Sequence, residues 1–269
     1  MQQDRAVLKM NTRRIMRERK KEVYLASIVF LALSIIISML SLRLSGVTEY
    51  VENASRTYME VYGEILETAE TSGAGEAAAK MQDLAKRIED SLYTWPERTV
   101  FSYILSVALF LSSLLLGAGY ISHCMLISRG EACSLRDLFN GFARPIRMLA
   151  LLFLISILTT LGFLLLIIPG FVLLYCYRLS IYVAYDNPEL GPVECMRKSR
   201  QLTRGRKWEL FVLDLSFIGW RLLGSVISNL FLPVLDIWLE PYIGITVAQW
   251  YNAASGHVVV MPENTDITE

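Results

Sequence analysis

The stretch from Met148 to Tyr177, MLALLFLISILTTLGFLLLIIPGFVLLYCY, contains no charged residue. A helix rises about 1.5 Å per residue, so roughly 20 apolar residues cross a hydrocarbon core of about 30 Å. One helix of roughly 30 residues would extend about 45 Å, which is too long for a single crossing. The Pro169-Gly170 pair interrupts the stretch, and we expect it to form the turn between two crossing helices, near residues 148–168 and 171–186.

Further apolar stretches flank this one on both sides. Val23–Leu42 and Thr99–Ser128 also lack charged residues, and the C-terminal third adds candidates at about 208–230 and 238–256. Across the chain 54% of residues are hydrophobic and 19% are charged, whereas soluble domains carry about 25% charged residues. The sequence therefore predicts an all-α fold, a polytopic transmembrane helical bundle of about six spans.

The distribution of Lys and Arg predicts the orientation, because loops rich in these residues stay in the cytoplasm. Residues 1–22 hold eight Lys and Arg against three acids, and basic clusters also lie in 129–147 and 186–207. The segment between the first two spans is acidic, so we place it outside. The expected divisions are a basic cytoplasmic N-terminal segment (1–22), a first transmembrane helix (23–44), an extracytoplasmic helical hairpin (45–98), a transmembrane core (99–256) and a cytoplasmic tail (257–269).

The predicted extracytoplasmic hairpin is visible in the spacing of its apolar residues. Two stripes with helical spacing occupy residues 47–93, and Gly73 and Gly75 lie between them. Two alternatives remain open for this segment: a solvated spacer whose helices cover each other, or a surface that binds a partner. The stripes are Val51, Ala54, Tyr58, Val61 and Ile65, followed by Ala77, Met81, Leu84, Ile88 and Leu92.

Two cytoplasmic segments have the pattern of interfacial helices. Ser134 is placed to cap the first, with Asp137 at its third position. The second begins at Pro192, and we expect Val193, Met196 and Leu202 to face lipid. Its basic residues are candidate contacts for anionic lipid, although the same charges can act only to set topology. These candidates are Arg197, Lys198, Arg200, Arg204, Arg206 and Lys207.

Three charges fall within the predicted spans: Arg178, Asp214 and Arg221. Arg178 lies roughly 12 Å inward from Asp186, and Asp214 lies roughly 9 Å inward from Trp208, so the two reach a similar depth. An unpaired charge there is costly. We therefore predict that the fourth and fifth spans are adjacent and that Arg178 pairs with Asp214. A structural ion pair and a permeation pathway are the two alternatives for these charges.

Several blocks of the sequence resemble one known family. They are RGE at 129–131, LRDLFNGF at 135–142, LLLIIPG at 164–170, DNPEL at 186–190, Lys207–Leu213 and LSFIGW at 215–220. In this order and spacing they resemble the bacterial multi-pass membrane proteins catalogued as domain of unknown function 975, over roughly residues 100–256. The resemblance implies an integral protein of the bacterial cytoplasmic membrane with no established activity. It transfers no catalytic residues.

The sequence offers no pattern typical of catalysis or of a bound cofactor. Phosphate-binding and nucleophile-elbow motifs are missing, and the four cysteines and two histidines lack the spacing of a metal site or a disulfide framework. The 26 basic residues balance the 26 acidic ones, which gives no indication of nucleic-acid binding. We expect a non-enzymatic structural or envelope-adaptation component that contacts membrane lipids or a protein partner in or outside the membrane. The alternative is a small transporter or channel.

Overall fold

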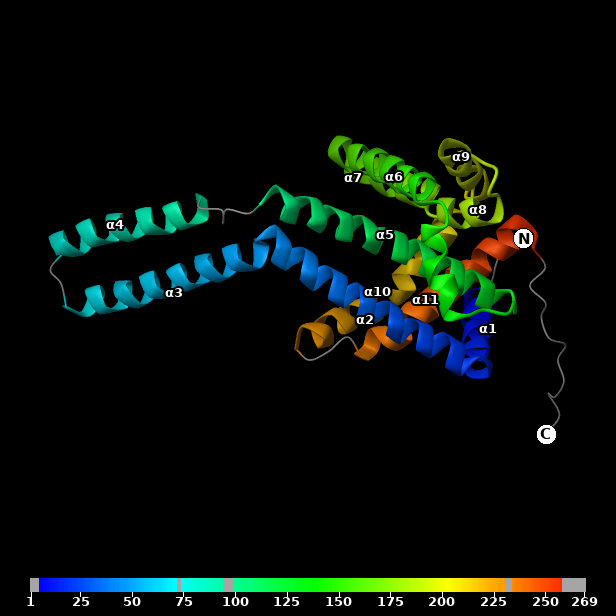
Figure 1. Ribbon diagram of the computed structural model, residues 1–269, viewed down its shortest axis with the longest axis horizontal. Helices are drawn as coiled ribbons and strands as arrows, with labels where there is room; N and C mark the ends of the chain where they lie inside the picture. Colours follow the sequence, from blue (N-terminus) through cyan, green and yellow to red (C-terminus); the bar gives the residue numbers. More distant parts are fainter. Residues whose placement is uncertain (1–4, 72–73, 94–98, 231–233, 258–269) are drawn as a thin grey trace. The chain divides into compact units, whose positions relative to one another are not determined.

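The computed structural model describes residues 5–71, 74–93, 99–230 and 234–257, and every regular element within them is helical (Figure 1). The chain forms two compact units. The main unit comprises residues 1–34 and 114–269, and the second comprises 35–113. The helices are α1 (Arg5–Glu18), α2 (Lys20–Ser45), α3 (Val47–Thr71), α4 (Ala74–Tyr93), α5 (Val100–Ser128), the 3-10 helix η1 (Leu135–Phe142), α6 (Pro145–Leu165), α7 (Ile167–Tyr177), α8 (Ser180–Asp186), α9 (Pro192–Leu202), α10 (Lys207–Leu230) and α11 (Val234–Ser255).

Four segments of the described chain are long and apolar enough to cross a membrane: α2, α5, α6, and α7 together with α8. In α2 only 11% of the most apolar window is buried, and side chains such as Ile36 and Met39 are exposed. The predicted fifth and sixth spans correspond to α10 and α11. Neither is among the four found in the described residues.

The predicted pair of helices between residues 148 and 186 is present, but the turn is not at Pro169-Gly170. The helical path stops at Leu166, whose backbone is extended (φ −162°, ψ 149°), and α7 begins at the next residue. Pro169 is therefore in the first turn of α7, where a missing N–H costs no helical hydrogen bond. Gly170 allows close packing of the two helices, since a Cβ there would lie 2.4 Å from the ring of Phe163.

A second difference is that the helix predicted over 171–186 is broken. It ends at Tyr177 and restarts at Ser180, so the short connection consists of Arg178 and Leu179. The side chain of Leu179 is fully buried. The break therefore places the backbone of a predicted intramembrane charge outside regular helix.

The core of the main unit is built around α11. Trp250 and Tyr251 are among its largest fully buried side chains. The predicted N-terminal segment also packs here: the hydroxyls of Thr12 in α1 and Thr246 in α11 are 3.0 Å apart, and Gln249 donates a hydrogen bond to Thr12. The basic N-terminal segment is therefore partly an element of the core.

Close backbone contact joins α5 to η1. A Cβ on Gly119 would lie 1.8 Å from the carbonyl oxygen of Leu138, and a Cβ on Gly141 would lie 2.0 Å from that of Leu115. The predicted cap of η1 is confirmed, since the backbone N–H of Ser134 donates to the Asp137 carboxylate at 2.6 Å. Glycine at both crossing points is what lets η1 pack directly on α5.

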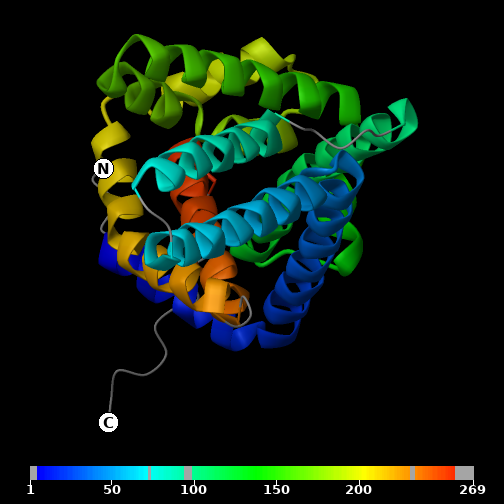
Figure 2. The same cartoon turned by 90° about the vertical axis from the view of Figure 1, so that its left-hand side faces the viewer.

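The second unit contains the predicted helical hairpin, formed by α3 and α4 (Figures 1 and 2). Val61 and Leu84 are buried in it, and Arg87 donates two hydrogen bonds to Glu64 at 3.0 and 2.9 Å. The expectation that the two stripes cover each other is wrong in part, because Val51 and Tyr58 are each 56% exposed. Helix α3 therefore keeps an uncovered apolar strip.

Candidate functional site

The candidate site lies at the break between α7 and α8, where three polar side chains meet. Arg178 donates from Nη2 to Asp214 Oδ1 at 2.7 Å, and the Tyr175 hydroxyl donates to Asp214 Oδ2 at 3.0 Å. About a quarter of each charged side chain is exposed (25% and 24%). The predicted pairing of Arg178 with Asp214 is thus confirmed, as is the adjacency of their helices.

Arg221 does not join this pair. It lies two turns further along α10 from Asp214 and its side chain is exposed. Of the three candidate intramembrane charges, the structure therefore brings two together and leaves the third apart.

Helix α9 supports the break from the other side. The break frees backbone carbonyls that a continuous helix would satisfy. The hydroxyl of Ser199 donates to the Cys176 carbonyl at 2.8 Å, and that of Thr203 approaches the same oxygen at 3.5 Å. Ser199 and Thr203 are both fully buried. Because the side chains of α9 replace the missing helical bonds, the break is a built feature of the fold.

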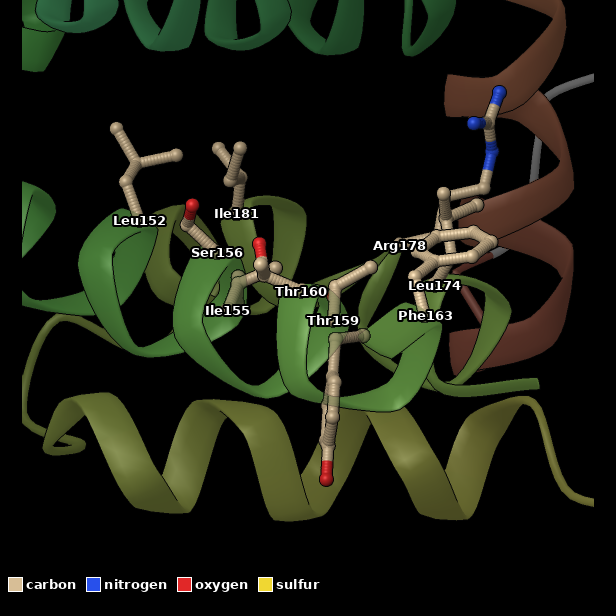
Figure 3. Close-up of a pocket in the computed structure, with 10 residues that line it drawn as sticks. Leu152, Ile155, Ser156, Thr159, Thr160, Phe163, Leu174, Arg178 and Ile181 are labelled. Atoms are coloured by element: carbon tan, nitrogen blue, oxygen red, sulfur yellow. The ribbon is translucent and has the colours of Figure 1, made fainter. Parts of the chain in front are cut away.

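A groove of about 530 Å³ adjoins the break and runs along α6 (Figure 3). Leu152, Phe163 and Ile181 contribute apolar walls, and hydroxyls of α6 also line it. In Figure 3 Leu152 lies at one end of the lining residues and Arg178 at the other. The groove therefore combines hydrocarbon walls with hydrogen-bonding groups. The α6 hydroxyls are those of Ser156, Thr159 and Thr160.

The six candidate lipid-binding basic residues divide into two groups. Arg197, Arg200 and Arg204 are exposed, whereas Lys198, Arg206 and Lys207 are partly buried. Lys198 donates to Asn187 Oδ1 at 2.6 Å, and Arg206 lies 3.3 Å from a Glu209 oxygen and 4.8 Å from the centre of the Trp250 ring. At least two of the six therefore act within the protein.

The prediction for the apolar face of α9 needs correction. Val193 is 58% exposed, but Met196 is only 5% exposed, because α9 packs against α6, α7 and α8. Met196 contributes to the protein core and does not face lipid. Protein therefore covers Met196 on the apolar face of α9, whereas Val193 stays exposed and Leu202 is partly buried.

One polar network was missed by the sequence analysis. Arg129, at the end of α5, makes two hydrogen bonds of 2.8 Å to the two carboxylate oxygens of Asp186. The Tyr251 hydroxyl donates to the same carboxylate at 2.7 Å, and Arg129 Nε donates to Asn252 at 2.9 Å. The hydrogen bonds to Asp186 raise the pKa of the Arg129 guanidinium above its usual value. The sequence held one signal for this pair: Arg129 begins the family block RGE, and Asp186 begins the block DNPEL.

Basic residues also hold the loop that follows α8. Arg147 donates to the Asn187 carbonyl at 2.8 Å, and Arg144 donates to the Pro188 carbonyl. From the sequence, these two arginines were expected only to set the membrane topology. Their guanidinium groups in fact satisfy backbone carbonyls beyond the helix end, which fixes the loop.

Metal chemistry finds no support in the part of the chain that the structure describes. No group of three His, Cys, Asp or Glu residues there is arranged to hold an ion. The four cysteines are free, and three of them are buried.

The comparisons with known proteins identify one family. A model described as "Protein of unknown function (DUF975)" matches residues 1–257. The match includes α1 and the α3–α4 hairpin, so it is wider than residues 100–256, where the sequence blocks lie. No curated protein and no solved structure matches the chain.

Proposed function

We infer the function of this chain from the premise that it belongs to the family described as Protein of unknown function (DUF975), whose model covers residues 1–257. Its four apolar helices are compatible with a membrane protein. We propose a six-span protein of the bacterial cytoplasmic membrane, in which α10 and α11 complete the bundle and both termini are cytoplasmic. The Lys and Arg distribution supports this topology.

Within that membrane we propose a non-enzymatic structural or envelope-adaptation role, carried out through lipid or protein contacts. The observation that supports it best is the internal pairing of charge. Asp214 neutralises Arg178 and Asp186 neutralises Arg129, so these charges join helices to one another. The exposed apolar side chains of α2, such as Ile36 and Met39, offer a surface for lipid. This proposal involves no cofactor and no nucleic acid.

Cysteine labelling in intact cells tests the topology. On a cysteine-free background we would compare Ala74→Cys, in the hairpin, with Arg200→Cys, on the exposed side of α9. An impermeant maleimide should label the first and not the second until the cells are permeabilised. Labelling of Arg200→Cys alone in intact cells would contradict the proposed orientation.

A small transporter or channel is the second candidate. The broken α7–α8 segment and the adjoining groove favour it, because interrupted helices form substrate sites in several transporter folds. Purified protein in proteoliposomes, with Asp214→Asn as the comparison, separates the two candidates. Solute flux that depends on Asp214 would favour transport, whereas a stable co-purifying partner without flux would favour the structural role.

A further inference from the structure

The exposed face of α9 carries a row of arginines. Four exposed residues recur there at intervals of four, three and four positions, which is the spacing of one helical face. They are Val193, Arg197, Arg200 and Arg204. Arg204 lies just past the last residue of α9, and its backbone N–H still donates to the Gln201 carbonyl. The row therefore continues into the turn that follows the helix.

The buried face of α9 fixes the direction in which this row points. Cys195, Ser199 and Thr203 are fully buried, because α9 packs against α6, α7 and α8 (Figure 1). Ser199 is held further by its hydrogen bond to the Cys176 carbonyl at 2.8 Å. Rotation of α9 would break these contacts. The arginine row is therefore held on the outside of the main unit, where a partner can reach all three guanidinium groups.

The row has no acidic partner among the residues that the structure describes. None of the ion pairs found there includes one of its three arginines. Arg14 on α1, by comparison, lies 2.9 Å from Glu18, one turn away. The one acid of α9, Glu194, caps the helix by accepting from the Gly191 N–H at 2.9 Å. Like charges one turn apart destabilise a helix, and an anion that bridges them removes that repulsion.

The side chains of the row select a phosphate that is attached to hydrocarbon. A guanidinium group is planar and makes two parallel hydrogen bonds to a phosphate, whereas an ammonium group acts as a point charge. Val193 in the same row is 58% exposed, and Trp208, four residues beyond Arg204, is 72% exposed. Tryptophan is enriched where headgroups meet hydrocarbon. A phospholipid therefore matches this surface better than a free phosphate does.

Nucleic acid is a poorer match. It is bound mainly through many phosphate contacts, whereas this row offers three cations in a chain whose charges balance at 26 and 26. In addition, α9 rests on α6 and on the α7–α8 segment, both apolar enough to cross a membrane. We propose that Arg197, Arg200 and Arg204 bind the headgroup phosphate of an anionic phospholipid. The inference rests on the proposed membrane function and names the lipid class and the residues that contact it.

Lipid titration of the purified full chain tests this site. Wild-type protein and the triple variant Arg197→Gln/Arg200→Gln/Arg204→Gln are each titrated in maltoside detergent with dioleoylphosphatidylglycerol, and native mass spectrometry counts the bound lipids. A basic residue near an anionic lipid surface contributes enough attraction for each lost arginine to weaken binding about fivefold. The triple variant should therefore bind the first lipid about 100-fold more weakly.

Three other probes define the ligand. Dioleoylphosphatidylcholine has the same chains and a phosphate but no net charge, and it should bind more weakly. Glycerol phosphate has no chains and should not compete at equal concentration, nor should a uridine decamer. Equal binding of phosphatidylcholine would overturn the anionic headgroup. Competition by glycerol phosphate would overturn the lipid as the ligand, and tighter binding of the decamer would assign the row to nucleic acid.

Two matched variants separate a docking site from net charge. Arg14→Gln/Arg17→Gln/Lys20→Gln removes the same charge from exposed positions near the N-terminus, and its lipid binding should stay within about twofold of wild type. Equal weakening in this control would overturn docking on α9. Replacement of the three α9 arginines by lysine keeps the charge but should still weaken binding, because the two-pronged contact is lost. Wild-type binding by the lysine variant would overturn the guanidinium–phosphate contact.

The folded state and the wider proposal are checked separately. The substituted side chains are exposed, so melting temperatures should be unchanged; if the triple variant melts early, the three single variants replace it, each with the fivefold effect. Unchanged lipid binding in these variants would overturn this inference and leave the proposed function standing, since α2 and a protein partner remain. An inverted cysteine-labelling pattern would overturn the proposed topology and leave binding in detergent unaffected.

Discussion

Arg129 and Asp186, 57 residues apart in sequence, form a two-pronged ion pair in which both N–H···O distances are 2.8 Å. The arginine follows the last turn of α5, the aspartate ends α8, and Tyr251 brings in α11 by donating to the same carboxylate. Their side chains are only 15% and 10% exposed. One carboxylate thereby joins the ends of three helices, because a planar guanidinium matches a carboxylate at two points.

Replacement of Arg129 tests the strength of this junction. Arg129→Ala leaves the Asp186 carboxylate partly buried without its cation, and we expect a loss of about 3–5 kcal/mol in unfolding free energy. Arg129→Lys should also destabilise, since an ammonium group cannot make the two-pronged contact. Thermal melting of detergent-purified protein provides the measurement. Arg14→Lys is the control, because its pair with Glu18 is exposed on both sides.

The Arg178–Asp214 pair is suited to a double-mutant cycle. Arg178→Gln and Asp214→Asn should each destabilise the protein, and their combination should cost less than the sum by about 0.5–3 kcal/mol. The reason is that either single change leaves one charge unpaired, whereas the double change removes both. The same cycle on the exposed Glu52–Arg56 pair should give near-additive effects. Additivity at Arg178 and Asp214 would show that the contact contributes little.

The glycines of α5 offer a matched pair of substitutions. Gly119→Ala places a methyl group on the backbone of Leu138, at 1.8 Å from its carbonyl oxygen, so η1 must move. We expect a loss of about 1–3 kcal/mol or more from overpacking. Gly117→Ala meets nothing within 4 Å and should be neutral or stabilising, since alanine favours helix. Similar melting temperatures for the two variants would contradict the close packing of η1.

Hydropathy and charge depth were sufficient to predict several elements of this fold. The apolar runs identified α2, α5 and α6. The similar depths expected for Arg178 and Asp214 in their helices identified the partner of Arg178. The position of the α6–α7 turn was missed, because proline is as acceptable in the first turn of a helix as it is in a loop. From sequence alone, Leu166 looks like any other residue in its apolar run.

The Arg129 network was missed for a different reason. Positive charges near span ends are explained equally well by topology and by hydrogen bonding, and only the fold shows which acceptors are within reach. The same ambiguity affected Lys198, which donates to Asn187 rather than standing free for lipid. Met196 was misplaced because helical periodicity reveals an apolar face but not whether protein or lipid covers it.

Cys133 has a pKa that predicts its reactivity. Burial and the hydrogen bond to Glu22 raise the pKa of this thiol from about 9 to about 11. The thiolate is the reactive form, so at pH 8 maleimide should react about 100-fold more slowly than with an ordinary cysteine. The rate should rise with pH up to about 11. Peptide-level mass spectrometry follows Cys133 in the presence of the buried cysteines.

Glu22→Gln provides the check on the cause. It removes a negative charge next to the sulfur, so the pKa of Cys133 should fall and the rate profile should move to lower pH. Arg19 also donates to this sulfur, at 3.3 Å, and favours the thiolate. A profile that is unchanged in Glu22→Gln would assign the slow reaction to burial alone.

The hairpin of α3 and α4 should be a separable appendage. Helices α3 and α4 pack against each other within the second unit, and Ser41 of α2 donates to the Ser106 carbonyl of α5 at 3.2 Å, a contact that does not involve the hairpin. A flexible linker of about 12 residues spans roughly 20 Å and can replace residues 47–93. Membrane insertion and melting temperature should then be nearly unchanged.

A point substitution supplies the matched comparison for this replacement. Leu84 is 2% exposed inside the hairpin, so Leu84→Asp buries an unpaired charge there and should unfold α3 and α4 alone. Limited proteolysis should then cut the hairpin while the main unit, with α5 from Leu114 onward and α6–α11, stays protected. If the linker variant loses all folded protein, the hairpin stabilises the membrane core. If Leu84→Asp loses all folded protein but the linker variant remains folded, the misfolded hairpin destabilises the rest of the protein.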